Sequence, residues 1–279
     1  MSFDEFAARK TREAEQADIP GLKTDFDRAP SRMIAIGNRW TLAAFDGPFY
    51  LSPATDARYP ACNLVFVQSR DGNTGAKNPS ALGGGETDKH VIYEGLSRVA
   101  ADAVLAGAET IRGGRLVFSV WHPELVALRS ALGKPRHPAQ IVATLRGLDV
   151  EHALLFNVPD IPVFVLTVAD CADLMGASFA SRPWITPIVM RGPKDIASAF
   201  ESLKGAGIGR ISCVGGRGIA GQLLDAGLVQ DVHLTTSAVD GGEPDTPMYR
   251  KPLPMDVIVR KRGCGPEAGI VFDHFARRD

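Results

Sequence analysis

Between residues 60 and 240, short apolar runs alternate with segments whose apolar side chains follow a helical spacing. The run 62–68 (CNLVFVQ) is almost continuously apolar, which is typical of a strand buried on both faces of a sheet. Residues 194–204 instead carry apolar side chains at the spacing of one helix face: Ile196, Ala199, Phe200 and Leu203. Strands that alternate with helices favour a mostly parallel sheet covered by helices on both faces.

The same alternation predicts the other elements of an α/β domain. After a long polar loop at 69–88, Thr87 or Asp88 is expected to cap a helix, because both side chains can accept a hydrogen bond from its first turn. The buried face of that helix is predicted to hold Val91, Ile92, Leu96 and Val99. Further helices are predicted at 123–132 and 218–226, and further strands at 101–107, 139–144, 162–168, 187–190, 210–214 and 230–238. The last two runs, 257–261 and 270–275, predict a C-terminal antiparallel hairpin.

The first 60 residues differ from the rest in their pattern. Residues 1–30 are charged and predict a partly helical extension. Two short strands are expected around a Gly37-Asn38 turn, and Asp46-Gly47-Pro48 marks a second turn. We therefore divide the chain into an N-terminal extension with a short hairpin (1–60), which could cover a sheet edge, and an α/β domain (61–279).

Composition excludes several classes of partner. The net charge of the 279 residues is −1, which gives no reason to expect nucleic acid or an anionic membrane as a partner. No apolar run reaches the roughly 18 residues of a membrane span, and the polar N-terminus does not resemble a signal peptide. We expect a cytoplasmic protein with reduced cysteines. No metal site is expected, because neither Cys nor His residues occur at ligand spacing.

The strongest local motif is RISCVGGRGIAGQLLDAGLV at 210–229. A strand runs into Gly215, Gly216, Arg217 and Gly218, and a helix begins at once. Such a turn lets the backbone approach a phosphate, and the helix N-terminus offers unpaired N–H groups to it. A tight turn with a glycine packed on the sheet is the structural alternative. Residues 216–221 match G-x-G-x-x-G, but too late in the chain for a dinucleotide-binding βαβαβ half-domain.

Three other predicted strands end in residues that suit a ligand site. They are followed by Gly107, Ala108, Glu109 and Thr110; by Ser69, Asp71 and Gly72; and by Thr144 and Arg146. Each group also has a reading without a ligand. Residues 107–110 can simply be the end of a strand, 69–72 an Asp-Gly turn, and Arg146 a solvent-exposed arginine in a turn. Parallel strands, however, bring all these ends to one edge of the sheet, where open α/β sheets bind ligands.

These motifs together resemble a known family. S-x-D-G at 69–72, A-D-A-V-L-x-G-A-x-T at 101–110 and the late glycine turn, whose helix ends in L-L-D-A-G-L-V at 223–229, are similar to the reductase domain of bifunctional riboflavin-biosynthesis proteins. The resemblance covers roughly residues 60–240 and implies a dihydrofolate-reductase-like fold, NADPH as cofactor and a homodimer. It also implies that the ribosyl group of a ribosylaminopyrimidine phosphate is reduced to a ribityl chain.

The resemblance assigns a role to each group of residues. Gly107, Ala108 and Thr110 would line the nicotinamide and its ribose, and Thr144 and Arg146 would meet the 2′-phosphate. The pyrophosphate would lie on Gly215, Gly216, Arg217, Gly218 and Ile219. Ser69, Asp71 and Gly72 would face the substrate.

Three departures from the family concern the substrate side. Val214 stands where the family has a carboxylate, Glu109 replaces a usual Gly, and 111–116 lacks the pattern D-N-P-x-L-T-x-R. Asp71 is then the first candidate for the catalytic acid and Glu109 the second. The alternatives are a reductase of the same fold for a pterin, a folate or another imine or carbonyl, and a nucleotide-binding protein without catalysis. The zinc signature of the family's partner deaminase is absent.

Overall fold

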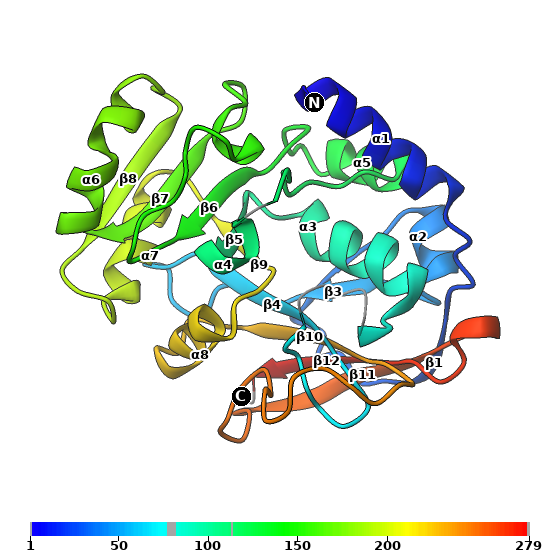
Figure 1. Ribbon diagram of the computed structural model, residues 1–279. Helices are drawn as coiled ribbons and strands as arrows, with labels where there is room; N and C mark the ends of the chain where they lie inside the picture. Colours follow the sequence, from blue (N-terminus) through cyan, green and yellow to red (C-terminus); the bar gives the residue numbers. More distant parts are fainter. Residues whose placement is uncertain (1, 77–81, 113, 278–279) are drawn as a thin grey trace.

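The centre of the molecule is a ten-stranded sheet with the order β1-β11-β12-β10-β4-β9-β5-β6-β7-β8, found in a computed structural model that describes residues 2–76, 82–112 and 114–277 (Figure 1). The strands from β10 to β8 are parallel: β4 (Ala61–Gln68), β5 (Ala103–Gly107), β6 (Ala139–Ala143), β7 (Val163–Val168), β8 (Ile185–Met190), β9 (Arg210–Cys213) and β10 (Asp231–Thr236). The others are antiparallel: β1 (Leu22–Asp27), β11 (Met255–Gly263) and β12 (Val271–Arg277). The predicted parallel sheet and C-terminal hairpin are confirmed.

Helices cover both faces of the sheet. On β5, Leu105 packs in one cluster with α7 (Ile196–Gly205) and α8 (Arg217–Asp225), while its neighbour Val104 packs in another with α6 (Ala169–Ala180). Successive side chains of a strand point to opposite faces, so the continuous apolar runs of the sequence follow from burial on both sides. α6 was not predicted from the sequence.

The helical segment after β4 is unusual. It consists of a π-helix, η2 (Thr87–Leu96), and a short α3 (Ser97–Val99), with a kink at Gly95. Its predicted apolar face is confirmed, because Val91, Ile92, Leu96 and Val99 are all buried. The predicted cap is wrong: neither Thr87 nor Asp88 caps η2.

A residue distant in the sequence supplies the cap of η2. The carboxylate of Glu267 in η4 (Gly265–Glu267) accepts hydrogen bonds from the N–H groups of Glu86 (2.6 Å) and Thr87 (3.2 Å). This capping is invisible in the sequence because the two segments are about 180 residues apart.

The first 60 residues wrap around the sheet. α1 (Phe3–Gln16) lies beside α5 (Pro123–Ala131) and buries Phe6 against Trp121, and β1 adds an edge strand beside β11 (Figure 1). The predicted strand after Gly37-Asn38 is wrong. Residues 39–44 form α2 (Arg39–Ala44), because Asn38 and Thr41 form a reciprocal capping box. β2 (Ile34–Ile36) pairs instead with β3 (Phe49–Leu51), beyond α2.

Among the described residues, no helix combines the length and the apolar character needed to cross a bilayer. Within the same ranges, no group of three or more His, Cys, Asp or Glu side chains is arranged to hold a metal ion.

Candidate active site

The carboxyl ends of the parallel strands meet at one edge of the sheet, and a cavity of about 320 Å³ lies there. It is bounded by the ends of β5, β6 and β8 and by the first residues of α4 (Ala108–Ile111), α7 and α8. The residues predicted from the sequence that line it are Gly107, Ala108, Glu109, Thr144, Arg146, Gly216, Gly218 and Ile219. Strand ends distant in the sequence therefore share one cavity.

The glycine turn after β9 touches the end of β5 directly. The N–H of Gly107 donates a hydrogen bond to the carbonyl oxygen of Gly215 at 3.3 Å. Gly216 has φ +93°, and a Cβ built on it would lie 3.3 Å from the Cγ2 of Ile219 and 3.6 Å from the Cα of Gly107. The turn therefore needs glycine for its backbone conformation and for the close approach of two strand ends.

The same turn opens α8 toward the cavity. Gly216 is the N-cap residue of α8, and no side chain caps the helix. The first N–H groups of a helix have no acceptor within it and carry the positive end of its dipole. Arg217 and Gly218 are exposed there, and Thr110 lies near Gly215, with its Oγ1 3.8 Å from where a Cβ of Gly215 would be. The arrangement can bind an anionic group.

The end of β6 presents Thr144 and Arg146 to the other side of the cavity. Thr144 is buried, and its hydroxyl donates to the carbonyl oxygen of Gly147 at 3.2 Å and lies 3.4 Å from the N–H of Arg146. Arg146 is exposed. The hydrogen bonds of Thr144 therefore hold a turn that positions Arg146 at the rim of the cavity.

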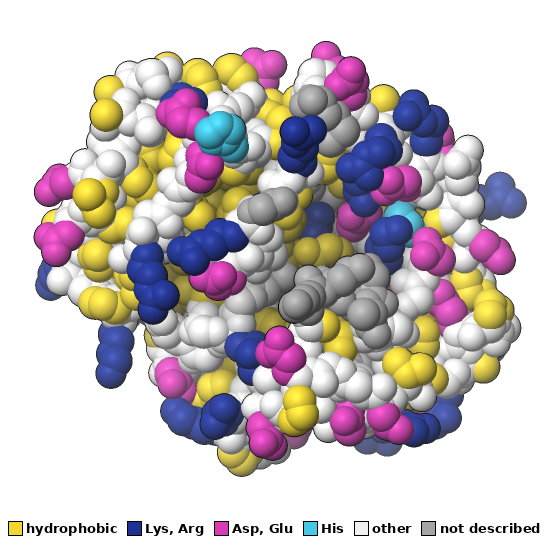
Figure 2. Space-filling model, in the orientation of Figure 1, with side chains coloured by type: hydrophobic (Ala, Val, Ile, Leu, Met, Phe, Trp, Pro, Cys, Tyr) yellow, Lys and Arg dark blue, Asp and Glu magenta, His cyan; other side chains and the backbone are white. Residues whose placement is uncertain are grey.

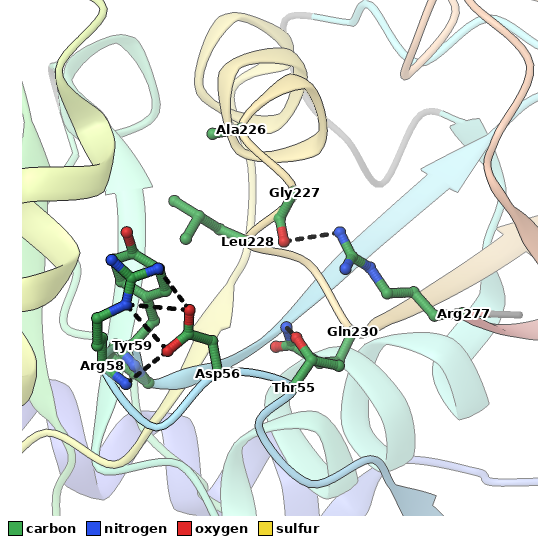
Figure 3. A pocket seen from close by; sticks show the side chains of 10 residues that line it. Thr55, Asp56, Arg58, Tyr59, Ala226, Gly227, Leu228, Gln230 and Arg277 are labelled. Carbon is green, nitrogen blue, oxygen red and sulfur yellow. Dashed lines mark hydrogen bonds and ion pairs between the residues drawn. The ribbon is translucent and has the colours of Figure 1, made fainter. Parts of the chain in front are cut away.

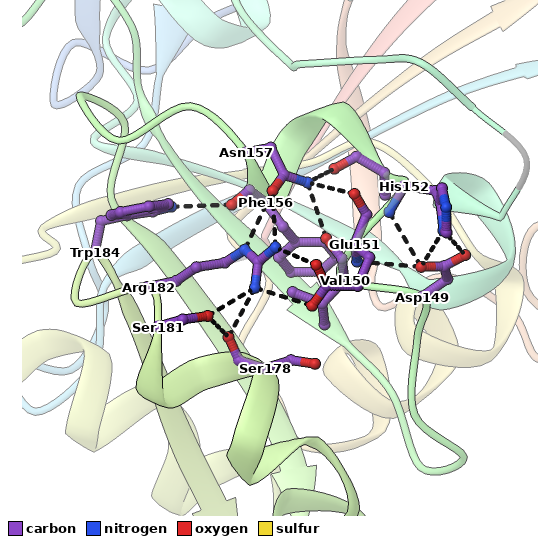
Figure 4. Close-up of polar contacts among 11 residues, drawn as sticks. Asp149, Val150, Glu151, His152, Phe156, Asn157, Ser178, Ser181, Arg182 and Trp184 are labelled. Carbon is purple, nitrogen blue, oxygen red and sulfur yellow. Dashed lines mark hydrogen bonds and ion pairs between the residues drawn. The ribbon is translucent and has the colours of Figure 1, made fainter.

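The segment that follows this turn is anchored on α6 (Figure 4). The guanidinium of Arg182 bonds the carboxylate of Glu151 at 2.7 Å, the side-chain oxygen of Asn157 at 3.1 Å and the carbonyl oxygen of Ser178 at 2.9 Å. The amide of Asn157 in turn donates to the carbonyl oxygen of Val150 at 2.9 Å. These contacts join both ends of the segment 150–157 to the C-terminus of α6.

Sequence reasoning missed one wall of the cavity. Met190, Pro193 and Ile196, from the end of β8 and the start of α7, line it together with Gln222 of α8. Arg112 also lines it and pairs with Glu109 at 2.9 Å. The amphipathic pattern of α7 predicted the helix, but apolar residues at its beginning carry no signal for a ligand.

The polar residues after β4 form a hydrogen-bond network that is separate from the cavity. The hydroxyl of Ser69 lies 2.5 Å from the carboxylate of Asp71 and 2.9 Å from the carbonyl oxygen of Gly241. Asp71 also accepts from the amide of Asn73 at 3.0 Å and from the N–H of Gly241 at 3.3 Å. Gly72 has φ +86° in this turn. None of the predicted group Ser69, Asp71 and Gly72 lines the cavity, so the structure does not bring it together with the other predicted site residues.

The contacts of Asp71 also set its charge. Its hydrogen bond from Ser69 is the main cause that lowers the pKa of Asp71 below the ordinary value. The carboxylate is therefore ionised at neutral pH, which suits a residue that orders a loop better than one that donates a proton. Part of the predicted 69–88 loop, residues 77–81, lies outside the described residues.

A second cavity, of about 290 Å³, lies at the opposite edge of the sheet (Figure 3). Gln230 and Pro60, which precede β10 and β4, line it, and Arg277 reaches across it to the carbonyl oxygen of Gly227 at 2.6 Å. Arg277 thereby contacts the turn that follows α8. None of the predicted site residues lines this second cavity.

Charges on the surface are mixed. Lys and Arg side chains lie among Asp and Glu side chains on the face that Figure 2 shows, so this face has no large patch of purely positive or purely negative charge. Hydrophobic side chains are exposed over the part of this face that α6, β7 and β8 form. Among the exposed hydrophobic residues of these elements are Leu174 of α6 and Val189 of β8.

Comparison with known proteins gives one family. A model described as the RibD C-terminal domain matches residues 60–264. No curated protein sequence matches the chain significantly.

Several solved structures share the fold with TM-scores above 0.5. A pyrimidine reductase-like protein from Corynebacterium diphtheriae is 19% identical, with a TM-score of 0.54 over 79% of this chain and 93% of its own. RibD from Acinetobacter baumannii is 15% identical, with a TM-score of 0.57 over 79% of this chain and 58% of its own. The riboflavin biosynthesis reductase Rib7 from Saccharomyces cerevisiae is 14% identical, with a TM-score of 0.53 over 79% of this chain and 91% of its own. The chain thus spans little more than half of the Acinetobacter RibD. The fold expected from the resemblance is confirmed.

Proposed function

Because the chain belongs to the family of RibD C-terminal domains, we propose that it is an NADPH-dependent reductase that acts on a ribosylaminopyrimidine phosphate. One observation carries this proposal: the glycine turn after β9, the small residues after β5 and the Thr144-Arg146 turn enclose a single cavity. A protein similar to this one, from Thermotoga maritima, is described as a deaminase and 5-amino-6-(5-phosphoribosylamino)uracil reductase. We take that uracil derivative as the first substrate to test.

The residues at the cavity fit a dinucleotide. A Cβ at Gly216 would fill the space against Gly107, so both positions keep the backbone open to a pyrophosphate. In the proposed complex the N–H groups of Gly216, Arg217, Gly218 and Ile219 hold this group, with Gly215 shaping the turn. Gly107, Ala108 and Thr110 border the nicotinamide and its ribose. A bound nicotinamide would supply the hydride.

Thr144 and Arg146 select the phosphorylated cofactor in this proposal. The planar guanidinium of Arg146 suits the 2′-phosphate of NADPH, which NADH lacks. The substrate lies beyond the nicotinamide, toward the end of β4. There Ser69, Asp71 and Gly72 shape the loop that confines it, and Glu109 stands at the mouth of the cavity.

Two measurements test the proposal. Fluorescence titration compares the affinities for NADPH and NADH, and absorbance follows NADPH oxidation with the phosphoribosylamino-uracil, a pterin, dihydrofolate and simple imines. We expect tighter binding of NADPH and turnover of the uracil derivative. Turnover of only a pterin or folate would make the protein a different reductase of this fold, and binding without turnover of any compound would make it a nucleotide-binding protein. The homodimer, the cytoplasmic location and the division at residue 60 remain predictions.

A further inference from the structure

We propose that Glu109 and Arg112 form a pair that selects the phosphorylated cofactor. In this proposal Arg112 joins Arg146 in binding the 2′-phosphate of NADPH, and Glu109 holds Arg112 when that phosphate is absent. The inference rests on the proposed function, which gives Arg146 a place at this phosphate. It adds two residues that the sequence motifs do not place there.

The charge of the cavity is concentrated in three side chains. Of the described residues that line it, only Glu109, Arg112 and Arg146 carry a charged side chain. Two arginines and one glutamate leave a surplus of positive charge. A phosphate monoester carries a charge of about −1.5 to −2 at pH 7, so this surplus favours a ligand of that class over an uncharged one.

The three side chains come from adjacent ends of the sheet. Gly107, the last residue of β5, pairs with Ala143, the last residue of β6. The two chains leave the sheet about 4.8 Å apart, one into α4 and the other into the turn that carries Arg146. Glu109 and Arg112 are three positions apart at α4, a spacing at which side chains on a helix meet. The fold therefore directs both arginines to the same cavity from neighbouring strands.

The ion pair of α4 is weak enough to open. Nη1 of Arg112 lies 2.9 Å from Oε1 of Glu109, and the two side chains are 44% and 78% exposed. An ion pair open to water contributes little free energy. An arginine and a phosphate can instead form two parallel charged hydrogen bonds. A phosphate can therefore take Arg112 from Glu109 at small cost, and the exposed Glu109 side chain has room to turn to solvent.

Arg146 is already available to the same ligand. Its backbone is held by the Thr144 turn, and its guanidinium has no acceptor within residues 2–76, 82–112 and 114–277. Only Arg112 must exchange its partner to complete a site of two guanidinium groups. Binding at this site then depends on the strength of the Glu109–Arg112 pair.

Glu109 gives the pair its selectivity. A carboxylate repels a phosphate, but it can accept a hydrogen bond from the 2′-hydroxyl of a ribose, which is how many NAD-binding domains recognise their cofactor. Arg112 offsets the negative charge of Glu109 in the cavity. Without Arg112, this charge would be unopposed and would favour NADH. The balance between the two side chains therefore sets the cofactor preference.

The first test measures binding without substrate, by fluorescence titration of the full chain with NADPH and with NADH. Arg112→Leu should weaken NADPH binding by about 10- to 100-fold, the range for hydrogen bonds between charged groups, and should not weaken NADH binding. Glu109→Gln should tighten NADPH binding by about two- to fivefold, because Arg112 no longer leaves an ion pair. Unchanged NADPH affinity in Arg112→Leu would overturn the proposal.

Two further variants make this result specific. Arg112→Lys keeps the charge without the planar guanidinium and should recover part of the lost NADPH affinity. Arg191→Leu is the matched control, because Arg191 follows β8 at the same edge of the sheet and pairs with Asp195 at 4.0 Å, but does not line the cavity. It should change neither affinity by more than about twofold. Equal losses in Arg112→Leu and Arg191→Leu would assign the effect to the overall charge of this edge and overturn the proposal.

The second test identifies the phosphate that Arg112 binds, because the proposed substrate also carries one. Adenosine 2′,5′-bisphosphate and AMP reproduce the adenosine ends of NADPH and NADH and contain no nicotinamide. Calorimetric titration should show that Arg112→Leu weakens binding of the bisphosphate by about tenfold or more and leaves AMP unaffected. If the fragments bind as in the wild type and only the KM for the phosphoribosylamino-uracil rises, Arg112 binds the substrate and the proposal is overturned.

The outcomes separate the two levels of inference. A wild type that binds neither dinucleotide would refute the proposed function. A wild type that prefers NADPH, and keeps the same preference in Arg112→Leu, would refute the role of the pair alone.

Discussion

The two halves of the sheet edge present polar groups in different ways. Over β5, β6 and β9, which we call the cofactor half after its proposed ligand, the polar groups include backbone amides at the N-terminus of α8, kept accessible by a glycine at position 216. Over β4 and β10, which we call the substrate half, they are side chains in networks. Asp71 bonds Gly241 across 170 positions of sequence, and Thr235 bonds Asp88 across 147.

This difference has a consequence for substitution. A backbone site tolerates changes of side chain but not an added Cβ, whereas a side-chain network depends on each hydrogen bond. Changes in the cofactor half should therefore affect dinucleotide affinity, and changes in the substrate half should affect turnover. Four substitutions can break or sharpen this division.

Gly216→Val should have the largest effect and abolish dinucleotide binding, with a loss of about 100-fold or more, because a branched side chain at φ +93° meets Ile219 and Gly107. Fluorescence titration measures the loss, and circular dichroism checks the fold. Gly207→Val is the matched control: Gly207 has φ +88°, with nothing within 4 Å of its Cβ position. Equal loss of binding in both variants would point to backbone strain alone.

Asp71→Asn should lower turnover by about 100-fold, because a loop displaced by an ångström misplaces the substrate. NADPH affinity should stay within about twofold, since the residue does not line the cavity at the ends of β5, β6 and β8. Turnover and titration on one preparation test both points. Unchanged turnover would leave Asp71 as a turn residue only.

Arg146→Ala should weaken NADPH binding by about 1–3 kcal/mol, the scale of a charge-assisted hydrogen bond, and leave NADH binding nearly unchanged. Arg58→Ala, an exposed arginine at the opposite edge of the sheet, serves as the control. If both cofactors lose affinity equally, Arg146 does not meet the 2′-phosphate.

The smallest effect concerns pH and β10, the strand that carries Thr235. Burial is the main cause that holds the pKa of His233 on β10 well below its ordinary value, and no hydrogen-bond partner is present for either ring nitrogen among the described residues. Below about pH 6.5 the unfolded chain binds a proton that the folded chain does not, so stability should fall by up to about 1.4 kcal/mol per pH unit. Thermal melts between pH 7 and 5 should show this slope, and His233→Phe should flatten it.

A slope that is the same in His233→Phe would assign the acid sensitivity to other groups. The result also sets the range for enzyme assays. Activity lost below pH 6 should be compared with the melting curve at the same pH before it is assigned to the site.

The two halves also differ in how far the sequence predicts them. Apolar runs and glycine spacing predicted the strands and several of the residues that line the cavity at their carboxyl ends, because both depend on local backbone requirements. The strand expected after Asn38 was wrong, because a capping box formed a helix there. The capping of η2 by Glu267 and the hydrogen bond between Thr235 and Asp88 could not be predicted, since each depends on a partner brought near only by folding.

NADPH oxidation with 5-amino-6-(5-phosphoribosylamino)uracil tests the central proposal most directly. The absorbance of NADPH and the ribityl product are followed together, with NADH as the parallel cofactor. The proposal predicts one NADPH consumed for each ribityl product and a clear preference for NADPH over NADH. NADPH that binds but is not oxidised by this substrate would contradict it.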